Sequence, residues 1–304
     1  MSLIPLDQVK TRMVAREGNS TRRRLPGWFK VSVKRGIRFQ EIQRILQTKG
    51  LHTICEEARC PNIWECWNNR TATFLILGDV CTRRCHYCSV TTGRPERVDS
   101  EEPGRVAEAV KALELRHAVI TSVNRDDLID GGASVFSQTI KAIREGIPTC
   151  TIEVLVPDFQ GHRIPIEMVL NAAPEIFNHN IETVPRLFPA VRPQGKYDRS
   201  LRVLRWAKQH GAQTKSGLMV GMGESRDEVM SVLRDLREVG CDILSIGQYL
   251  QPTKEHRDVH RYYELEEFED MKQWGMNLGF RHVESGPLVR SSYHAEQQAA
   301  TCDR

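Results

Sequence analysis

The sequence lacks several features that define common classes of protein. Its 304 residues contain no apolar run of the roughly 20 residues that a membrane-spanning helix requires, so a membrane protein is excluded. It has no apolar signal-peptide core near its N-terminus, no internal repeat and no low-complexity tract. A composition of 40% hydrophobic and 27% charged residues excludes a disordered chain. We expect a cytoplasmic protein with one large domain and extensions, or with two domains.

Acidic residues are scarce at the beginning of the chain. Residues 1–50 hold twelve lysines and arginines but only three acidic residues, a net charge of +9, whereas the remaining 254 residues carry −5. A basic arm suits an acidic partner, although charge alone fits a solvated tail equally well. The run Arg22 to Arg24 is too short to favour nucleic acid, so we expect neither nucleic acid nor a membrane as a partner.

Cysteine is the residue type whose distribution carries information. The count of nine is odd, and with no secretory signal the cysteines are expected to be thiols. Three of them, Cys150, Cys241 and Cys302, are scattered. The other six lie within 34 positions: Cys55, Cys60, Cys66, Cys81, Cys85 and Cys88. This clustering indicates metal binding in a reducing compartment.

From about residue 70, short apolar segments alternate with amphipathic stretches of helical period. Strands are predicted at 73–77, 117–121, 151–156, 176–181, 217–220 and 242–246. Helices are predicted near 101–114, 134–146, 163–172, 198–210 and 226–239, with a last one at 262–278. This alternation predicts an α/β fold with a parallel sheet. Because no Gly-x-Gly-x-x-Gly turn follows the first strand, we favour a partial TIM-like (β/α)6 barrel over an open doubly wound sheet.

One cysteine triplet, Cys81-x3-Cys85-x2-Cys88, follows the first predicted strand. In parallel α/β folds the loops after the strands carry the chemistry, so this triplet is expected at the mouth of the barrel. A structural zinc site normally needs four ligands, whereas three cysteines on a cubane iron–sulfur cluster leave one iron open. A zinc loop or buried free thiols remain the alternatives. Tyr87 offers an aromatic ring that could cover an adenine.

A second triplet, Cys55-x4-Cys60-x5-Cys66, lies earlier in the chain, and 14 residues separate its last cysteine from Cys81. It is also one ligand short of four, and its spacing matches no familiar zinc knuckle. Pro61 favours an irregular loop. A structural zinc or unrelated thiols stay open for this triplet taken alone. If it holds a cluster, a fourth ligand must come from elsewhere in the chain or from the substrate.

Together these motifs carry a specific resemblance. A Cys-x3-Cys-x2-Cys motif after the first barrel strand resembles the radical S-adenosylmethionine (SAM) superfamily. With the upstream triplet and Arg290-Ser291-Ser292-Tyr293 near the end, the chain resembles the lipoyl synthase family over roughly residues 25–295. The stretches 121–127 and 177–183 also look familial.

The resemblance implies insertion of two sulfur atoms at C6 and C8 of an octanoyl chain that is amide-linked to a lysine of a carrier domain. It assigns to Cys81, Cys85 and Cys88 a [4Fe-4S] cluster that binds SAM and generates a radical. It assigns to Cys55, Cys60 and Cys66 a second [4Fe-4S] cluster that donates sulfur, completed by Ser292, with Ser291 as the less favoured neighbour. A radical suits this substrate because aliphatic C–H bonds offer nothing to a general base or a nucleophile.

Candidate SAM contacts lie at the ends of the predicted strands. Asn124 and Asp126 follow the second strand and could meet the ammonium and carboxylate groups, whereas Asn180 and Glu182 could accept ribose hydroxyls. The segment Gly221 to Glu224 lets backbone approach a ligand. Each of these residues could equally be an ordinary helix cap or turn residue.

The resemblance also implies a domain plan and partners. Residues 1–69 would form a basic extension with the auxiliary cluster motif, 70–260 the radical SAM barrel, and 261–304 a helix and tail. Expected partners are octanoylated carrier domains (the glycine cleavage H protein and 2-oxoacid dehydrogenase E2), a ferredoxin or flavodoxin, and an iron–sulfur carrier for cluster repair. The basic arm could steer docking of an acidic carrier domain.

Two alternative functions remain open at this point. A related radical enzyme that modifies RNA would also fit the basic arm, although such enzymes usually append a recognition domain for which the chain has no room. A non-catalytic zinc or iron–sulfur module would not require a barrel that leads from an open triplet.

Overall fold

The computed structural model describes residues 25–29, 36–69 and 71–300. Most of the basic arm, including Arg22 to Arg24, lies outside the described residues, as does Cys302. Within the described part, an eight-stranded sheet has the order β1-β2-β5-β6-β7-β8-β9-β10. Its strands are β1 (His52–Thr53), β2 (Thr73–Ile76), β5 (His117–Ser122), β6 (Thr151–Leu155), β7 (Ile176–Asn178), β8 (Gln213–Val220), β9 (Ile243–Gln248) and β10 (His282–Gly286).

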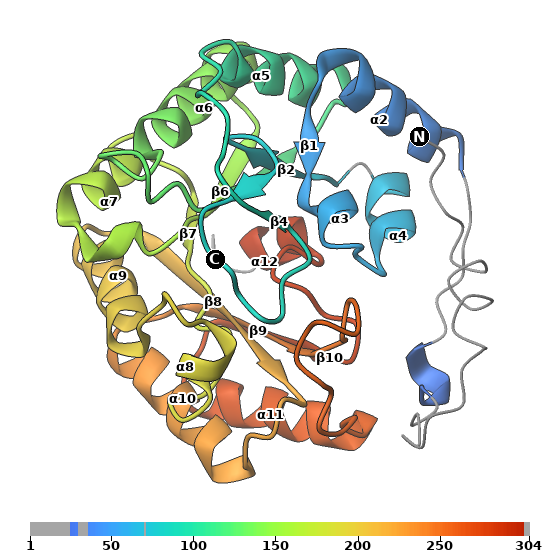
Figure 1. The fold of residues 1–304 in the computed structure, drawn as a ribbon, viewed down its shortest axis with the longest axis vertical. Coiled ribbons are helices and arrows are strands. Elements are labelled where there is room, and N and C mark those ends of the chain that lie inside the picture. The colour runs from blue at the N-terminus through green and yellow to red at the C-terminus, as the bar shows by residue number, and fades with distance from the viewer. Residues whose placement is uncertain (1–24, 30–35, 70, 301–304) are drawn as a thin grey trace.

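All neighbours in this sheet are parallel except β1, which pairs antiparallel with β2. The helices α5 (Glu102–Ala112), α6 (Ala133–Gly146), α7 (Arg163–Leu170), α9 (Tyr197–Gln209), α10 (Arg226–Glu238) and α11 (Leu265–Asn277) lie along its outer side (Figure 1). Since β1 and β10 are the two ends of the strand order, the barrel is open on one side. The predicted partial barrel is confirmed.

The six predicted strands correspond to β2 and β5 to β9. β8 begins four residues before its predicted start because its first half is polar yet buried; Thr214, Lys215 and Ser216 are fully buried. β1 and β10 lie outside the prediction. β10 comes from the segment expected to be only a helix and a tail, and it extends the parallel sheet to a seventh strand.

The helix ends follow ordinary capping chemistry. Ser225 and Glu228 form a capping box at the start of α10, and Glu264 and Glu267 form one at the start of α11. The helix α2 (Ile37–Lys49) ends at Gly50, whose φ of 59° suits glycine. The two capping boxes start α10 and α11 and thereby fix where the loops after β8 and β9 end.

The N-terminal segment packs on the open side of the barrel. It carries α2, α3 (Ile54–Glu57) and α4 (Ile63–Asn68) (Figure 1). Phe39 of α2 stacks on Trp64 and Trp67 of α4, with ring centroids 4.3 and 4.7 Å apart. Such aromatic contacts add to ordinary hydrophobic burial, so α4 has a rigid support.

The C-terminal tail returns across the same open side. The asparagine Nδ2 of Asn62, between α3 and α4, donates to the carbonyl of Leu288 at 2.6 Å. The last helix, α12 (Ala295–Ala300), lies against β5, where Arg116 and Glu296 form an ion pair of 2.9 Å. Sequence-distant ends therefore meet where the barrel is open. No helix among the described residues is both long enough and apolar enough to cross a membrane.

Candidate functional site

One large cavity opens at the carboxyl ends of the parallel strands, with a volume of about 3280 Å³. A typical small-molecule pocket has roughly 300–1,000 Å³, so this space can take more than one ligand. All six clustered cysteines, Ser291 and Ser292 line it. Two triplets that are separate in sequence therefore face a common space.

The loop that carries Cys81, Cys85 and Cys88 leaves the barrel after β2. Cys81 ends the short strand β3 (Val80–Cys81), which pairs with β4 (Thr91–Thr92). The Cys81 sulfur accepts backbone N–H groups from Arg83 at 3.4 Å and from Asn124 at 3.3 Å. Hydrogen bonds to a ligand sulfur both orient it and tune a bound metal group.

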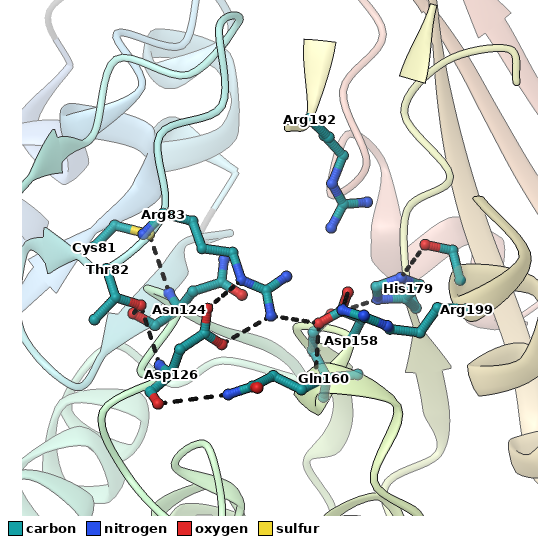
Figure 2. A network of polar contacts seen from close by, with 12 residues as sticks. Cys81, Thr82, Arg83, Asn124, Asp126, Asp158, Gln160, His179, Arg192 and Arg199 are labelled. Carbon is teal, nitrogen blue, oxygen red and sulfur yellow. Dashed lines mark hydrogen bonds and ion pairs between the residues drawn. The ribbon is translucent and has the colours of Figure 1, made fainter. Parts of the chain in front are cut away.

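Arg83, inside this loop, is the centre of a buried charge network (Figure 2). Its guanidinium donates to both carboxylate oxygens of Asp126 at 2.6 and 2.8 Å, and it lies 2.7 Å from a carboxylate oxygen of Asp158. Arg199 pairs with Asp158 from the other side at 3.1 Å. Burial alone would lower the pKa of Arg83, yet the two carboxylates hold it above its usual range. The network fixes the first cysteine loop to the loops after β5 and β6.

The second triplet sits in the N-terminal segment. Cys55 lies in α3, whose start is capped by the Thr53 side chain. The backbone N–H of Cys60 donates to the Cys55 carbonyl at 2.9 Å, which folds the intervening loop back. Cys66 lies in α4, the helix that stacks on Phe39. The three thiols therefore come from two short helices and the loop between them, and the aromatic stack on Phe39 supports the second helix.

The chemistry of these thiols fits iron–sulfur clusters. Burial raises the pKa of Cys55 and of Cys88 to about 12, so each needs a cation before it can become a thiolate. Four-coordinate zinc, with Zn–S bonds near 2.3 Å, would draw sulfurs to about 3.8 Å from one another. Neither triplet approaches this: among the described residues, only His52, Glu57 and Asp79 bring three candidate ligand atoms within 4.8 Å. The wider spacing suits a larger cluster.

The two serines of the tail have different surroundings. Ser291 Oγ accepts a hydrogen bond from Asn180 Nδ2 at 2.7 Å and lies over Gly217, where a Cβ would be only 3.0 Å away. A Cβ at Gly247 would collide with the Val289 carbonyl. These two glycines let the tail press against β8 and β9. Ser292 lines the cavity and has no hydrogen-bond partner among the described side chains.

A second charged group faces the cavity near Cys85. Arg192 is only 6% exposed, and its Nη1 donates to the Asn180 carbonyl at 3.0 Å. Burial raises the pKa of the Glu182 carboxyl, while Arg192 opposes this shift. Glu182 has a φ of 69°, an uncommon value for a residue other than glycine and one that recurs at functional sites. The ring of Tyr87 lines the same region, so opposite charges and an aromatic face occur together.

The predicted SAM contacts divide into two groups. Asn124, Asn180, Glu182 and Tyr87 line the cavity, and the side-chain oxygens of Asn124 and Asn180 are buried without a partner. Asp126 and Glu224 are not among the lining residues. Asp126 binds Arg83, whereas Glu224 accepts the N–H groups of Gly221 and Met222 at 2.6 and 2.9 Å. The two carboxylates therefore stabilise loops at the barrel mouth: Asp126 the cysteine loop through Arg83, and Glu224 the loop after β8.

Sequence reasoning missed the ionic groups inside the barrel, because arginine and lysine normally indicate a surface. Arg83 and Arg192 are two of them. Below the cavity, Lys215 binds Glu153 at 3.0 Å and Asn178 donates to Glu153 at 2.8 Å, all three fully buried. For Lys215 and Glu153 the only signal in the sequence was a charged residue inside a predicted strand. The sequence alone does not show whether such a side chain points into the barrel or toward solvent.

The sequence and the fold are both similar to those of known proteins. Residues 75–247 match the model of the radical SAM superfamily, and residues 5–60 match the N-terminal domain of lipoyl synthase. Two solved structures share the fold: methylornithine synthase (PylB), 15% identical with a TM-score of 0.51 over 70% of each chain, and Streptococcus suis SuiB with its precursor peptide, 12% identical with a TM-score of 0.55 over 81% of this chain and 52% of that one. The chain is therefore a radical SAM barrel.

Two curated relatives narrow the class. The lipoyl synthase of Rubrobacter xylanophilus is 62% identical over 92% of this chain and 88% of that protein; the lipoyl synthase of Chloroflexus aggregans is 52% identical over 96% of both. The chain belongs to the lipoyl synthase family. It is a radical SAM enzyme that inserts two sulfur atoms at C6 and C8 of a protein-bound octanoyl-lysine, with SAM and [4Fe-4S] clusters as cofactors.

Proposed function

We propose how this chain divides the reaction among its residues. Cys81, Cys85 and Cys88 hold the cluster that binds SAM, and the triplet Cys55, Cys60 and Cys66 holds the auxiliary cluster. The observation that carries this assignment is that both triplets line one cavity, each with three thiols, and that no further cysteine among the described residues lines it. When bound, the first cluster supplies the electron that makes a carbon radical from SAM, and the second supplies sulfur.

Ser292 is the fourth ligand of the auxiliary cluster in this proposal. It is favoured over Ser291 because the Ser291 hydroxyl already accepts from Asn180 and lies against Gly217. Ser292 lines the cavity together with Cys55, Cys60 and Cys66. An alkoxide oxygen is a ligand of another kind than a thiolate, which suits a cluster that is dismantled during turnover.

The charged groups near Cys85 select SAM. Its methionine part is a zwitterion, and Glu182 and Arg192 offer one charge of each sign beside the open cluster. Tyr87 covers the adenine, and the unpartnered oxygens of Asn124 and Asn180 accept polar hydrogens of the cofactor. Asp126 and Glu224 act one step removed, through Arg83 and through the backbone after β8.

The surrounding chain keeps the radical from water and delivers the substrate. The cavity is large enough for SAM and an extended octanoyl chain together, and its apolar lining suits a hydrocarbon. In the domain plan of extensions 1–69 and 261–304 around a 70–260 barrel, the described parts of the two extensions bring the sulfur source to the open side of the barrel. Holding the acyl chain between two clusters replaces diffusion with a fixed geometry.

The partners follow from the chemistry. The acyl chain arrives on a lipoyl-carrier protein, and the proposed carriers are the glycine cleavage H protein and 2-oxoacid dehydrogenase E2. A ferredoxin or flavodoxin provides low-potential electrons, and an iron–sulfur carrier rebuilds the consumed cluster. We propose the cytoplasm as the compartment, because oxidation-sensitive clusters and free thiols favour a reducing environment.

Anaerobic reconstitution of the full chain tests the assignment. Two [4Fe-4S] clusters predict about eight irons and eight sulfides per chain. Addition of SAM, a reductant and an octanoylated carrier should yield the dithiolane product and two 5′-deoxyadenosines per lipoyl group. Zinc in place of iron, or only four irons with full product yield, would contradict the two-cluster assignment.

A further inference from the structure

The tail that bears Ser292 is held on its outer side by a single carboxylate. The Tyr293 hydroxyl donates one hydrogen bond that the two carboxylate oxygens of Glu65 share, at 3.1 and 3.2 Å from the hydroxyl oxygen. The Nε2 of His294 lies 3.2 Å from Glu65 Oε1. The rings of Tyr293 and His294 are stacked, with centroids 3.8 Å apart. Glu65 therefore binds both residues that directly follow Ser292.

The helix that carries Glu65 is itself firmly held. Glu65 immediately precedes Cys66 on α4, and α4 is supported by the stack of Phe39 on Trp64 and Trp67. On the tail side, His294 also faces Glu284 of β10, with Nδ1 and Oε1 3.7 Å apart. The carboxylate thus links the helix of the second triplet to the edge strand of the barrel.

The inner side of the tail has its own anchor. Ser291 is bound by Asn180, and Asn62 Nδ2 holds the Leu288 carbonyl. Ser292 is left between an inner anchor at Ser291 and an outer anchor at Tyr293. A side chain fixed on both neighbours loses little further freedom when it binds a ligand.

We propose that Glu65 is a positioning residue that presents Ser292 to the auxiliary cluster. This inference rests on the proposed ligand role of Ser292. Glu65 acts through Tyr293 and His294 and touches neither cluster nor substrate. Its own side chain is 48% exposed, so its contacts contribute little to the stability of the whole fold, and its effect is confined to the tail.

The test compares Glu65→Ala and Glu65→Gln in the full chain carrying both clusters. Glu108→Ala is the matched control, because it removes another exposed carboxylate, paired with Lys49 at 2.6 Å, that links the N-terminal segment to the barrel without contact to the tail. Two quantities are measured. One is the lipoyl product formed per 5′-deoxyadenosine, and the other is amide hydrogen exchange of residues 288–294.

Loss of two charge-assisted hydrogen bonds at a half-exposed site should lower product per 5′-deoxyadenosine by about three- to tenfold in Glu65→Ala. The rate of SAM cleavage should stay within about twofold of wild type, and exchange at 288–294 should accelerate by a similar three- to tenfold. Glu65→Gln keeps an acceptor oxygen and should recover most of the product ratio. Glu108→Ala should match wild type in both measurements.

Two results would overturn the proposal. Unchanged exchange at 288–294 in Glu65→Ala would show that the carboxylate does not hold the tail. Faster exchange with an unchanged product ratio would show that the contact is structural only. Failure of the ligand role itself has a different signature: Ser292→Ala would then keep the wild-type product ratio, whatever Glu65→Ala does to exchange.

Discussion

At the scale of single residues, Ser291 and Ser292 show how neighbouring identical side chains acquire different roles. Ser291 is already engaged by Asn180 and packed on Gly217, whereas Ser292 faces the cavity with the second cysteine triplet. The sequence offered a reason to look for an oxygen ligand but could not separate the two, because their difference arises from contacts with β7–β8 residues more than 70 positions away.

Ser292→Ala should impair sulfur insertion far more than SAM cleavage. Removal of one ligand from the auxiliary cluster leaves the Cys81, Cys85 and Cys88 site intact, so 5′-deoxyadenosine formation should remain within about twofold while lipoyl product falls by at least about tenfold. Product and 5′-deoxyadenosine are measured in the same reaction. Ser291→Ala, the matched control, should lose less product; an equal loss in both variants would contradict the assignment.

His179 makes stability depend on pH. Burial, with a contribution from Arg192, lowers its pKa from 6.5 to about 4, and its ring nitrogens lie 2.8 Å from the Val156 carbonyl and 3.0 Å from Ser200 Oγ. Between pH 6.5 and about 4, His179 is therefore protonated in the unfolded chain but neutral in the folded protein. The stability present above pH 6.5 is lost as pH falls toward 4, by up to about 3 kcal/mol.

His179→Gln should remove this part of the pH dependence. Anaerobic urea unfolding at pH 7, 6 and 5 gives the slope for wild type and variant. The wild-type midpoint should fall more steeply than the variant midpoint over this range. Parallel slopes would mean that His179 titrates alike in the folded and unfolded states.

At the scale of elements, the loop after β2 depends on a residue that the motif does not include. Arg83 lies within the Cys81 to Cys88 segment, and its side chain and that of Asp158 are almost fully buried. Cluster ligands come from one loop, whereas Asp126 and Asp158 come from the loops after β5 and β6. The first cluster loop therefore takes its position from two neighbouring βα connections (Figure 2).

Arg83→Met should be strongly destabilising. The substitution leaves the carboxylates of Asp126 and Asp158 without the cation between them, and Asp158 is fully buried. Loss of one partner from a buried ion pair lowers the free energy of unfolding by about 3–5 kcal/mol. Arg186→Met is the control, since Arg186 pairs with Glu228 at 2.7 Å but is 58% exposed, and loss of such an exposed pair should leave the unfolding midpoint close to that of the wild type. Anaerobic urea unfolding compares them, and equal losses would contradict the buried role.

The same scale shows what sequence patterns can predict. Short continuous apolar runs predicted the six strands because these strands are buried on both faces, and apolar residues at helical period predicted the helices because one face of each helix is buried. They did not predict β1 and β10, the two edge strands, whose pairing depends on where the chain returns to the sheet. The position of Cys81, Cys85 and Cys88 after the first strand predicted that they lie at the barrel mouth, but nothing in the sequence placed the second triplet beside them. Nor could the sequence show that Asp126 and Glu224 bind protein groups, since a carboxylate in a loop looks the same with either partner.

At the scale of the whole molecule, the described segments 36–69 and 288–294 meet at the open side of the barrel and carry the second cysteine triplet and the two serines there. The basic arm precedes this region. Arg22 to Arg24 lie outside the described residues, so their role is a matter of charge: a segment with a net charge of +9 over 50 residues should attract an acidic carrier domain.

Reversal of Arg22, Arg23 and Arg24 to glutamate should lower kcat/KM on the intact carrier by about tenfold at low salt, and by less at high salt, because screening weakens steering. Turnover of a short octanoylated peptide should be unchanged. Reversal of Arg202 and Arg205, which are exposed on the outer helix α9, serves as the control. An unchanged rate and salt dependence on the intact carrier would remove the docking role.

The central claim is that this chain holds two separate iron–sulfur clusters on two cysteine triplets around one cavity. Anaerobic iron counting, with Mössbauer spectra of ⁵⁷Fe protein, tests it most directly on wild type, on the Cys55, Cys60 and Cys66→Ala triple variant, and on the Cys81, Cys85 and Cys88→Ala triple variant. The account predicts about eight irons in the wild type and about four in each variant. Four irons in the wild type, or the loss of all iron when either triplet is removed, would contradict it.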